Sequence, residues 1–249
     1  MLNKSYKEFS QIYDLLMDDI DYEKWTSFII NNTGNIGGGK KILEAACGTG
    51  SITKLLAENE YKVTAFDLSQ DMLMRAYEKL GRSPVVKLLN MDMADFKIDD
   101  KFHAAICCCD GINYLTFEKT ENFFANIYNH LGDDSIFIFD MSTEFKYKSM
   151  FNETYVYDDG EIFYVWENMA NEKNNSVDIE INFFVKDSSN KYTRINEIQT
   201  QYVHNAKKIT ELLKKIGFSH IEVYGDYSDK MYNNTSMRAV FCAKKERKQ

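Results

Sequence analysis

Carboxylates that lie in or directly after apolar, strand-like segments are the residues of this chain that are best placed to bind a ligand. Glu44 lies within ILEAACGTGS (residues 42–51), Asp67 ends VTAFD, and Asp92 follows VVKLLNM. Asp67 lies 17 residues beyond Gly50. An aspartate at this distance after a glycine turn typically accepts hydrogen bonds from ribose hydroxyls. Three neighbouring carboxylates repel phosphate groups and favour a cation. The acidic residues therefore predict a site for a positively charged nucleoside.

The glycines of ILEAACGTGS indicate that the backbone of this loop lies close to that ligand. Gly48 and Gly50 allow the backbone to come close to a ligand, and a helix that starts after them points its N–H groups at it. A loop for a pyrophosphate would favour a third glycine where this chain has Thr53. An adenosine that carries a sulfonium and an amino-acid tail fits this loop better, with main-chain carbonyls near Ala46 accepting from the ammonium group.

Two further segments complete the predicted site. In NMDMADF, we expect Asp92 to accept from the exocyclic amine of adenine, with the main chain of Met93 beside the ring. In CCDGINYL, we expect Cys108, Asp110 and Tyr114 to line the pocket next to the group that is transferred. The alternatives are that Asp110 caps the next turn and that Tyr114 only packs.

The elements that must position these residues alternate between strand and helix patterns. Apolar segments at 41–46, 61–69, 85–92, 103–110 and 135–141 are separated by helical patterns. This alternation predicts an α/β fold with a doubly wound, Rossmann-like, parallel sheet. Right-handed crossovers would bring the loops after these strands to one edge, where such sheets bind ligands.

The pattern changes near residue 150. Segments 161–168, 176–187 and 191–203 are β-rich and joined by polar turns, which predicts an antiparallel meander. A helix ending at Gly217 and strands at 218–225 and 237–245 then resume the α/β pattern, which predicts seven strands in the main sheet. We therefore expect a cofactor-binding domain at 1–149 and 205–249, with an inserted β subdomain at 150–204.

The inserted segment is rich in aromatic residues, and we expect it to roof the pocket of the second substrate. The alternative is that these side chains form the core of the insertion or the contact face of a homodimer. The residues concerned include Tyr164, Trp166, Phe183 and Tyr202.

The composition of the 249-residue chain excludes some classes of binding partner. Its net charge is −8, which disfavours a nucleic-acid partner, and its basic cluster at 244–248 is interpreted as a solvated end. No apolar run approaches a membrane span, and the start lacks the apolar core of a signal peptide, so we expect a cytoplasmic protein that does not act at a membrane. We expect core packing of the cysteines in reduced form, and neither disulfides nor a metal site, at Cys47, Cys107, Cys108, Cys109 and Cys242.

The four segments ILEAACGTGS, FDLSQDML, NMDMADF and CCDGINYL resemble, in order and spacing, the motifs of class I S-adenosylmethionine-dependent methyltransferases. The N-terminal YKEFSQIYDLLMDDIDYEKW, the meander and ELLKKIGF extend the resemblance over nearly the whole chain. They are similar to a bacterial small-molecule branch related to sugar-amine N-methyltransferases.

The resemblance implies S-adenosylmethionine as cofactor and a role for each matching residue. The glycine loop would border the methionine moiety, the segment at Asp67 the ribose, and NMDMADF the adenine. An N-terminal lid would close over the cofactor. The residues implied in cofactor binding are Tyr13, Trp25, Ala46, Gly48, Gly50, Asp67, Leu68, Asp92, Met93 and Cys108.

Catalysis would then be methyl transfer to a small-molecule acceptor, with an amine as one candidate. Tyr114 and Asp110 are the candidate residues near the methyl group, although sugar-amine enzymes of this type carry a histidine where this chain has Tyr114. The histidines of the chain are interpreted as structural. Two alternatives stand beside this hypothesis: an NAD-dependent oxidoreductase, and a non-catalytic protein that binds the cofactor.

Overall fold

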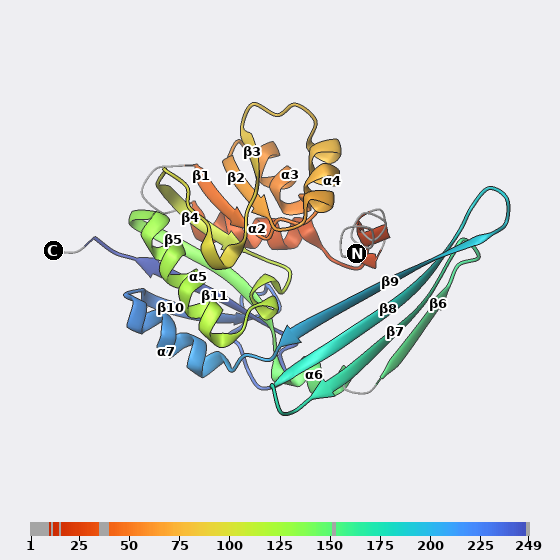
Figure 1. Cartoon of the computed structure of the whole chain (residues 1–249). Coiled ribbons are helices and arrows are strands. Elements are labelled where there is room, and N and C mark those ends of the chain that lie inside the picture. The colour runs from red at the N-terminus through yellow and green to blue at the C-terminus, as the bar shows by residue number, and fades with distance from the viewer. Residues whose placement is uncertain (1–9, 11, 15, 35–39, 151–152, 248–249) are drawn as a thin grey trace.

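The computed structural model describes residues 10, 12–14, 16–34, 40–150 and 153–247. Its centre is a seven-stranded sheet with the order β10-β11-β5-β4-β1-β2-β3 (Figure 1). The chain runs from β1 to β2 and β3 on one side and then returns to β4 on the other side of β1, so the strand order reverses between β1 and β4. The strands are β1 (Lys41–Ala45), β2 (Lys62–Asp67), β3 (Val86–Asn90), β4 (Phe102–Cys107), β5 (Leu131–Ser142), β10 (Ser219–Gly225) and β11 (Arg238–Lys245).

The main sheet is mixed rather than wholly parallel. Strands β1 to β5 pair in parallel, whereas β11 is antiparallel to both of its neighbours, β5 and β10. The connection between β10 and β11 contains no helix, and a parallel return would require a crossover connection. The expected doubly wound α/β sheet of seven strands is confirmed, with one reversed strand at its C-terminal side.

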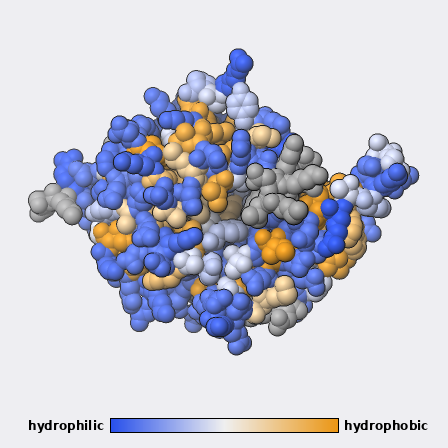
Figure 2. Space-filling view, in the orientation of Figure 1, coloured by the Kyte–Doolittle hydropathy of each residue, from blue (hydrophilic) through white to orange (hydrophobic). Residues whose placement is uncertain are grey.

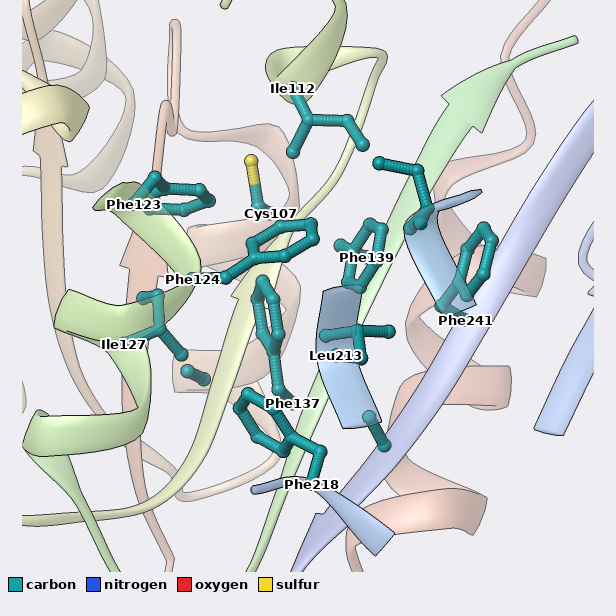
Figure 3. Close-up of a cluster of buried hydrophobic side chains, with 14 of the residues drawn as sticks. Cys107, Ile112, Phe123, Phe124, Ile127, Phe137, Phe139, Leu213, Phe218 and Phe241 are labelled. Atoms are coloured by element: carbon teal, nitrogen blue, oxygen red, sulfur yellow. The ribbon is translucent and has the colours of Figure 1, made fainter. Parts of the chain in front are cut away.

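Helices cover both faces of the main sheet. Strand β5 shows how, because Phe137 and Phe139 contribute to one apolar core and Ile136 and Ile138 to the other. The first core holds α5 and α7 against the sheet and is dominated by stacked phenylalanines (Figure 3). The second holds α2 and α3. The helices are α2 (Tyr22–Thr33), α3 (Ser51–Glu58), α4 (Gln70–Leu80), α5 (Phe117–His130), α6 (Glu144–Met150) and α7 (Ala206–Ile216), with 3-10 turns η1 (Met93–Asp95) and η2 (Gly111–Tyr114).

Local sequence explains where these helices begin and end. The Ser69 side chain accepts from the backbone N–H of Met72 at the start of α4, and Gly81 follows its last residue. Helix α5 ends at His130, because Leu131 begins β5. Among the described residues, no helix combines the length and the apolar character needed to cross a membrane.

The segment after β5 and α6 forms a second, four-stranded antiparallel sheet that projects from the main body (Figure 1). Its strands are β6 (Thr154–Asp158), β7 (Ile162–Asn171), β8 (Ser176–Lys186) and β9 (Tyr192–Tyr202). Alternate residues of β8 are buried, as their period of two predicts. Strand β6 was not expected from the sequence, since TYVYD is short and exposed throughout. The domain boundaries at 150 and 204 stay a prediction.

The inner face of this second sheet packs on the N-terminal segment. Phe183 is fully buried in a cluster that includes Ile12, with Tyr164 and Trp166 packed against its edge. Phe183, Tyr164 and Trp166 therefore contribute to a core. That the inserted segment roofs the pocket of the second substrate stays a prediction. Figure 2 shows a mostly hydrophilic face, with hydrophobic residues both in the upper middle of the main body and along the projecting second sheet.

Two local expectations need correction. Strand β4 ends at Cys107, so Cys108 and Cys109 lie in the turn that follows and do not continue the strand. The basic cluster at the end of the chain is only partly a solvated tail. Lys245 belongs to β11, and its Nζ donates to the carbonyl oxygens of Tyr128 and Leu131. Residue 248 lies outside the described residues.

Candidate active site

A cavity of about 710 Å³ opens at the carboxyl ends of β1, β2, β3 and β4, beside the point where the strand order reverses. This volume is in the range typical of small-molecule sites. Most predicted site residues line it: Tyr13, Ala46, Gly48, Asp67, Leu68, Asp92, Met93, Cys108 and Tyr114. Trp25, Gly50 and Asp110 are not among the described residues that line it.

The loop after β1 explains the different places of the two glycines. Both Gly48 and Gly50 have left-handed backbone angles, with φ of 54° and 76°. A Cβ at Gly48 would lie 4.0 Å from a ring carbon of Tyr13, on the cavity side. A Cβ at Gly50 would lie 3.1 Å from the Cβ of Ala76 in α4. Gly48 thus shapes the cavity, whereas Gly50 allows α4 to pack closely.

Asp67 joins the loops that follow β1 and β2. Its Oδ2 accepts from the backbone N–H of Gly48 at 2.8 Å, and its Oδ1 accepts from that of Ser69 at 2.8 Å. Burial raises the pKa of Asp67, and the hydrogen bonds from the backbone N–H groups of Ser69 and Gly48 oppose that rise. The carboxyl group is therefore held at the cavity wall in a fixed orientation.

Glu44 is a buried carboxyl group in the wall of the cavity. It is 3% exposed, and its Oε2 accepts from the hydroxyl of Thr53 at 2.6 Å. Burial raises the pKa of Glu44 to about 8; the Thr53 bond opposes this and the charge of Asp67 adds to it. A cation bound in the cavity would favour the ionised form.

The loop after β3 supplies the far wall. Asp92 accepts from the backbone N–H of Ala94 at 2.8 Å, which starts η1 and places Met93 at the cavity. The side chain of Asn90 donates to the carbonyl oxygens of Asp67 and Leu68, tying this loop to the one after β2. Leu68 is 69% exposed at the cavity, so an aromatic ligand could cover its side chain.

Hydrogen bonds and an ion pair hold the N-terminal segment against the loop after β1 and against α4. Asp14 accepts from the hydroxyl of Thr49 and forms an ion pair with Lys79 of α4 at 2.9 Å. Lys79 also donates to Thr49 and to Ser51. Because Tyr13 precedes Asp14, these bonds hold the tyrosine at the cavity. That this segment acts as a lid stays a prediction.

Asp110 belongs to a buried ionic network behind the cavity. Arg238 of β11 pairs with both Asp110 and Asp140 of β5, and the Ser142 hydroxyl donates to Asp110 at 2.7 Å. Burial would raise the pKa of Asp110, but the charges of Arg238 and Lys146 outweigh it and the pKa falls. The same network explains how the turn that carries Cys108 and Cys109 is held, since the backbone N–H of Asp110 donates to Asp140.

Trp25 contributes to this network instead of lining the cavity. The Arg238 guanidinium lies 4.8 Å from the centre of the Trp25 ring, and Trp25 stacks on Tyr227 at 4.3 Å. Sequence reasoning missed Arg238, because a single arginine in a terminal strand carries no motif.

Tyr114 meets a residue of the inserted sheet at the cavity. Its hydroxyl donates to Oε1 of Gln199 in β9 at 2.7 Å, and both residues line the cavity. The sequence offered no signal for Gln199, which is far from Tyr114 along the chain. Lys119 of α5 is the one basic residue among the described residues that line the cavity, against the carboxylates of Glu44, Asp67, Asp71 and Asp92.

The fold and the position of the cavity define a nucleotide-type site of the class I methyltransferase architecture, and comparisons with known proteins agree. Residues 42–134 match the family model described as a methyltransferase domain. YqeM of Bacillus subtilis (strain 168), which is named as a methyltransferase, is 34% identical over 97% of this chain and 98% of its own. A crystal structure of an S-adenosylmethionine-dependent methyltransferase from Clostridium acetobutylicum is 31% identical, covers 97% of this chain and 99% of its own, and has a TM-score of 0.85.

The chain belongs to the S-adenosylmethionine-dependent methyltransferases, and S-adenosylmethionine is its cofactor. More distant relatives carry amine-specific names. Glycine/sarcosine N-methyltransferase of Aphanothece halophytica is 26% identical over 84% of this chain and 77% of its own. A dTDP-amino-sugar N,N-dimethyltransferase of Streptomyces venezuelae is 30% identical over 39% of this chain and 40% of its own. The resemblance to the branch related to sugar-amine enzymes is confirmed, and the NAD-dependent alternative is set aside.

The described residues suit this cofactor chemically. It is cationic at sulfur and at its ammonium group, and the lining is acidic. Its ribose hydroxyls need an acceptor of the kind that Asp67 provides, and its adenine needs an apolar surface of the kind that Leu68 and Met93 provide. When bound, it supplies a methyl group on a good leaving group.

Proposed function

We propose that this methyltransferase transfers the methyl group to the nitrogen of a small-molecule amine. The observation that carries the proposal is the polar end of the cavity, formed by Tyr114 and Gln199. No histidine is found among the cavity-lining residues that the structure describes. A neutral amine can attack without a strong base, whereas a hydroxyl acceptor would need one in place.

The step itself requires alignment more than acid–base chemistry. The nitrogen lone pair forms the N–C bond, the C–S bond breaks, and its electron pair stays on sulfur as a neutral thioether. The methylated nitrogen then loses its proton to water. Holding the two partners in line can contribute on the order of 7–11 kcal/mol to lowering the barrier. The protein's task is to position the amine and exclude water.

We assign the cofactor contacts as follows. Ala46 and Gly48 would border the methionine moiety, Asp67 would accept from the ribose hydroxyls, and Asp92 with Met93 would flank the adenine. The support is that these residues line one cavity in this order of strands. Leu68, Cys108 and Tyr13 complete the set, with Tyr13 as part of the N-terminal lid.

Three other predicted residues fit indirect roles better. Gly50 packs against α4, Trp25 packs against Arg238, and Asp110 pairs with Arg238. We propose that Asp110 positions the turn before Tyr114. Tyr114 remains the candidate next to the reacting nitrogen.

Relatives support a nitrogen acceptor. The names of the Aphanothece and Streptomyces venezuelae proteins specify amino-acid and amino-sugar nitrogen as the methylated group. Net charge of −8 favours a small molecule over a nucleic acid. Five free cysteines favour the reducing cytoplasm as the place of action. Whether the protein forms a homodimer stays a prediction, to be measured by light scattering after gel filtration.

Formation of S-adenosylhomocysteine tests the proposal. The full chain is incubated with S-adenosylmethionine and a panel of primary and secondary amines, with the corresponding alcohols as controls. Turnover with amines and not with alcohols is expected. Turnover with alcohols alone would overturn the amine assignment. Binding without turnover of either class would favour a non-catalytic protein, and thermal shifts with S-adenosylmethionine and S-adenosylhomocysteine measure that binding separately.

A further inference from the structure

The charged side chains that line the cavity come from different parts of the main sheet. The acidic ones lie in β1, in β2 or in the segments that follow β2 and β3: Glu44, Asp67, Asp71 and Asp92. The basic one, Lys119, belongs to α5, which follows β4 on the other side of β1. Among the described residues that line the cavity, Lys119 is the only lysine or arginine. The lining is therefore acidic along β1 to β3 and basic at one residue near the start of α5.

Hydrogen bonds hold the start of α5 in place beside the cavity. Nε2 of His204, which follows β9, lies 3.2 Å from the carbonyl oxygen of Ile112 and 3.0 Å from that of Leu115. A carbonyl oxygen only accepts, so the histidine donates to this segment. The hydroxyl of Thr116 then caps the helix by accepting from the backbone N–H of Lys119 at 3.3 Å. Because these bonds fix the first turn of α5, Lys119 has a defined position at the cavity.

The ammonium group of Lys119 forms no ion pair with the residues that the structure describes. On a helix, side chains three and four positions apart are the ones that meet. The residues at these spacings from Lys119 are uncharged: Leu115, Thr116, Asn122 and Phe123. Of the two nearest glutamates in sequence, Glu118 is adjacent and lies on another face of the helix. The other, Glu121, pairs with Lys215 of α7 at 2.7 Å.

A lysine with no acidic partner among the described residues, in a lining that is otherwise acidic, is available to bind an anion. We propose that Lys119 binds an anionic group of the methyl acceptor, a carboxylate or a phosphate, and thereby selects amines that carry such a group. This inference rests on the proposed function and specifies the substrate class of that site. The amine of the acceptor would face the methyl group, and its anion would face α5. This orientation keeps the anion away from the carboxyl groups of β1 to β3.

The cofactor carries a carboxylate of its own, which is the other anion that would enter the cavity. We assign its methionine moiety to the loop after β1, at Ala46 and Gly48. That loop leads into α3, and the backbone N–H groups at the start of a helix can bind a carboxylate without a lysine. Lys119 follows β4 instead. The two assignments predict different results, because removal of a lysine that held the cofactor would weaken cofactor binding itself.

The test compares pairs of amines in which one member carries an anion and the other does not. The pairs are glycine with glycinamide, 4-aminobutyrate with 4-aminobutanamide, and 3-amino-3-deoxyglucose 6-phosphate with 3-amino-3-deoxyglucose. S-adenosylhomocysteine formation by the full chain gives kcat and KM for each. The ratio of kcat/KM between the anionic and the neutral member is then compared between the wild type and each variant. This comparison cancels the different basicity of the two amines.

Lys119→Met should lower this ratio about fivefold for any active pair, which is the upper end of the effect of a partly exposed ion pair. The loss should appear in KM, with kcat within about twofold, because the contact is made in the ground state as well as in the transition state. Lys119→Glu should lower the ratio further, since like charges repel. A larger fall for the sugar phosphate pair would identify phosphate as the group bound, and a larger fall for the other two pairs would identify carboxylate.

Lys208→Met is the matched control. Lys208 is the exposed third residue of α7, as Lys119 is of α5, and its backbone N–H donates to the capping Asn205 at 3.2 Å. It is not among the residues that line the cavity. Each substitution removes one positive charge from the first turn of a helix, so the two should change thermal stability alike. Only Lys119→Met should change the ratio, and an equal fall in both variants would overturn the inference as a general effect of net charge.

The remaining outcomes separate this inference from the proposed function. If Lys119→Met still methylates amines with the ratio of the wild type, Lys119 does not select anions, and the proposed function stands. Failure of every amine, anionic or neutral, would overturn both. The Kd of S-adenosylhomocysteine, measured by calorimetry, should stay within about twofold in Lys119→Met. A rise in this Kd that matches the fall in kcat/KM would assign Lys119 to the carboxylate of the cofactor and overturn its role in acceptor choice.

Discussion

The hydroxyl of Thr53 donates a 2.6 Å hydrogen bond to Oε2 of Glu44 in the buried wall of the cavity. This bond joins two departures from a pyrophosphate-binding loop, the carboxyl group inside the strand and the missing third glycine. A glycine at position 53 would leave Glu44 without this donor. The loop after β1 is therefore built around a carboxyl group, which suits a cationic ligand.

Glu44 should make stability depend on pH. Burial raises the pKa of Glu44 from 4.5 to about 8 in the folded protein, so folding takes up a proton between these values. The contribution of Glu44 to stability should be fully present below about pH 4.5 and fall as the pH rises toward 8, by on the order of 1 kcal/mol per pH unit at most. Urea unfolding from pH 5 to 8 measures this slope. Glu44→Gln should have a shallower slope than the wild type, and an identical slope would refute the assignment.

Asp67 should dominate cofactor affinity. Asp67→Ala removes the acceptor of two backbone N–H groups, at Gly48 and Ser69, together with the proposed ribose contact. We expect the Kd of S-adenosylmethionine to rise roughly 10- to 100-fold, because hydrogen bonds to charged groups are worth about 1.5–3 kcal/mol. Calorimetry measures the Kd, with a thermal melt to confirm folding. Unchanged affinity would remove the ribose assignment.

The ion pair between Asp14 and Lys79 should control release of the cofactor. Lys79→Met would loosen the N-terminal segment that places Tyr13 at the cavity. Because partly exposed ion pairs contribute about 0.2–1 kcal/mol, we expect S-adenosylhomocysteine to dissociate roughly twofold to fivefold faster. Stopped-flow displacement measures this rate. Lys54→Met is the control, since Lys54 pairs with Glu58 on the exposed side of α3. An equal increase in the dissociation rate in both variants would show that the ion pair between Asp14 and Lys79 does not slow cofactor release.

Arg238 should be essential to stability, since it is the charge partner of two buried carboxylates. Arg238→Met leaves Asp110 and Asp140 facing each other without it, and removal of one member of a buried ionic group costs about 3–5 kcal/mol. Denaturant unfolding measures the loss. Adding Asp140→Asn should recover part of it by relieving the repulsion. No recovery in the double variant would show that the loss arises from packing on Trp25 instead.

The sequence by itself determined which residues line the part of the cavity that we assign to the cofactor. Glu44, Gly48, Asp67 and Asp92 each stand at the end of, or within, an apolar strand pattern, and parallel strands carry such residues to one edge. Local sequence patterns were sufficient to predict the positions of these four residues, because each is positioned by the strand that contains or precedes it.

Only the tertiary structure decided the other half. No sequence pattern indicates that Gln199 reaches Tyr114. The inserted sheet and the turn after β4 are far apart in sequence, and their contact depends on how whole elements pack. Trp25 and Asp110 were predicted at the cavity, but burial beside Arg238 draws them into the network behind it. A buried guanidinium needs carboxylates and an aromatic face near it. That requirement is met by residues from three distant parts of the chain, so it becomes visible only once the chain is folded.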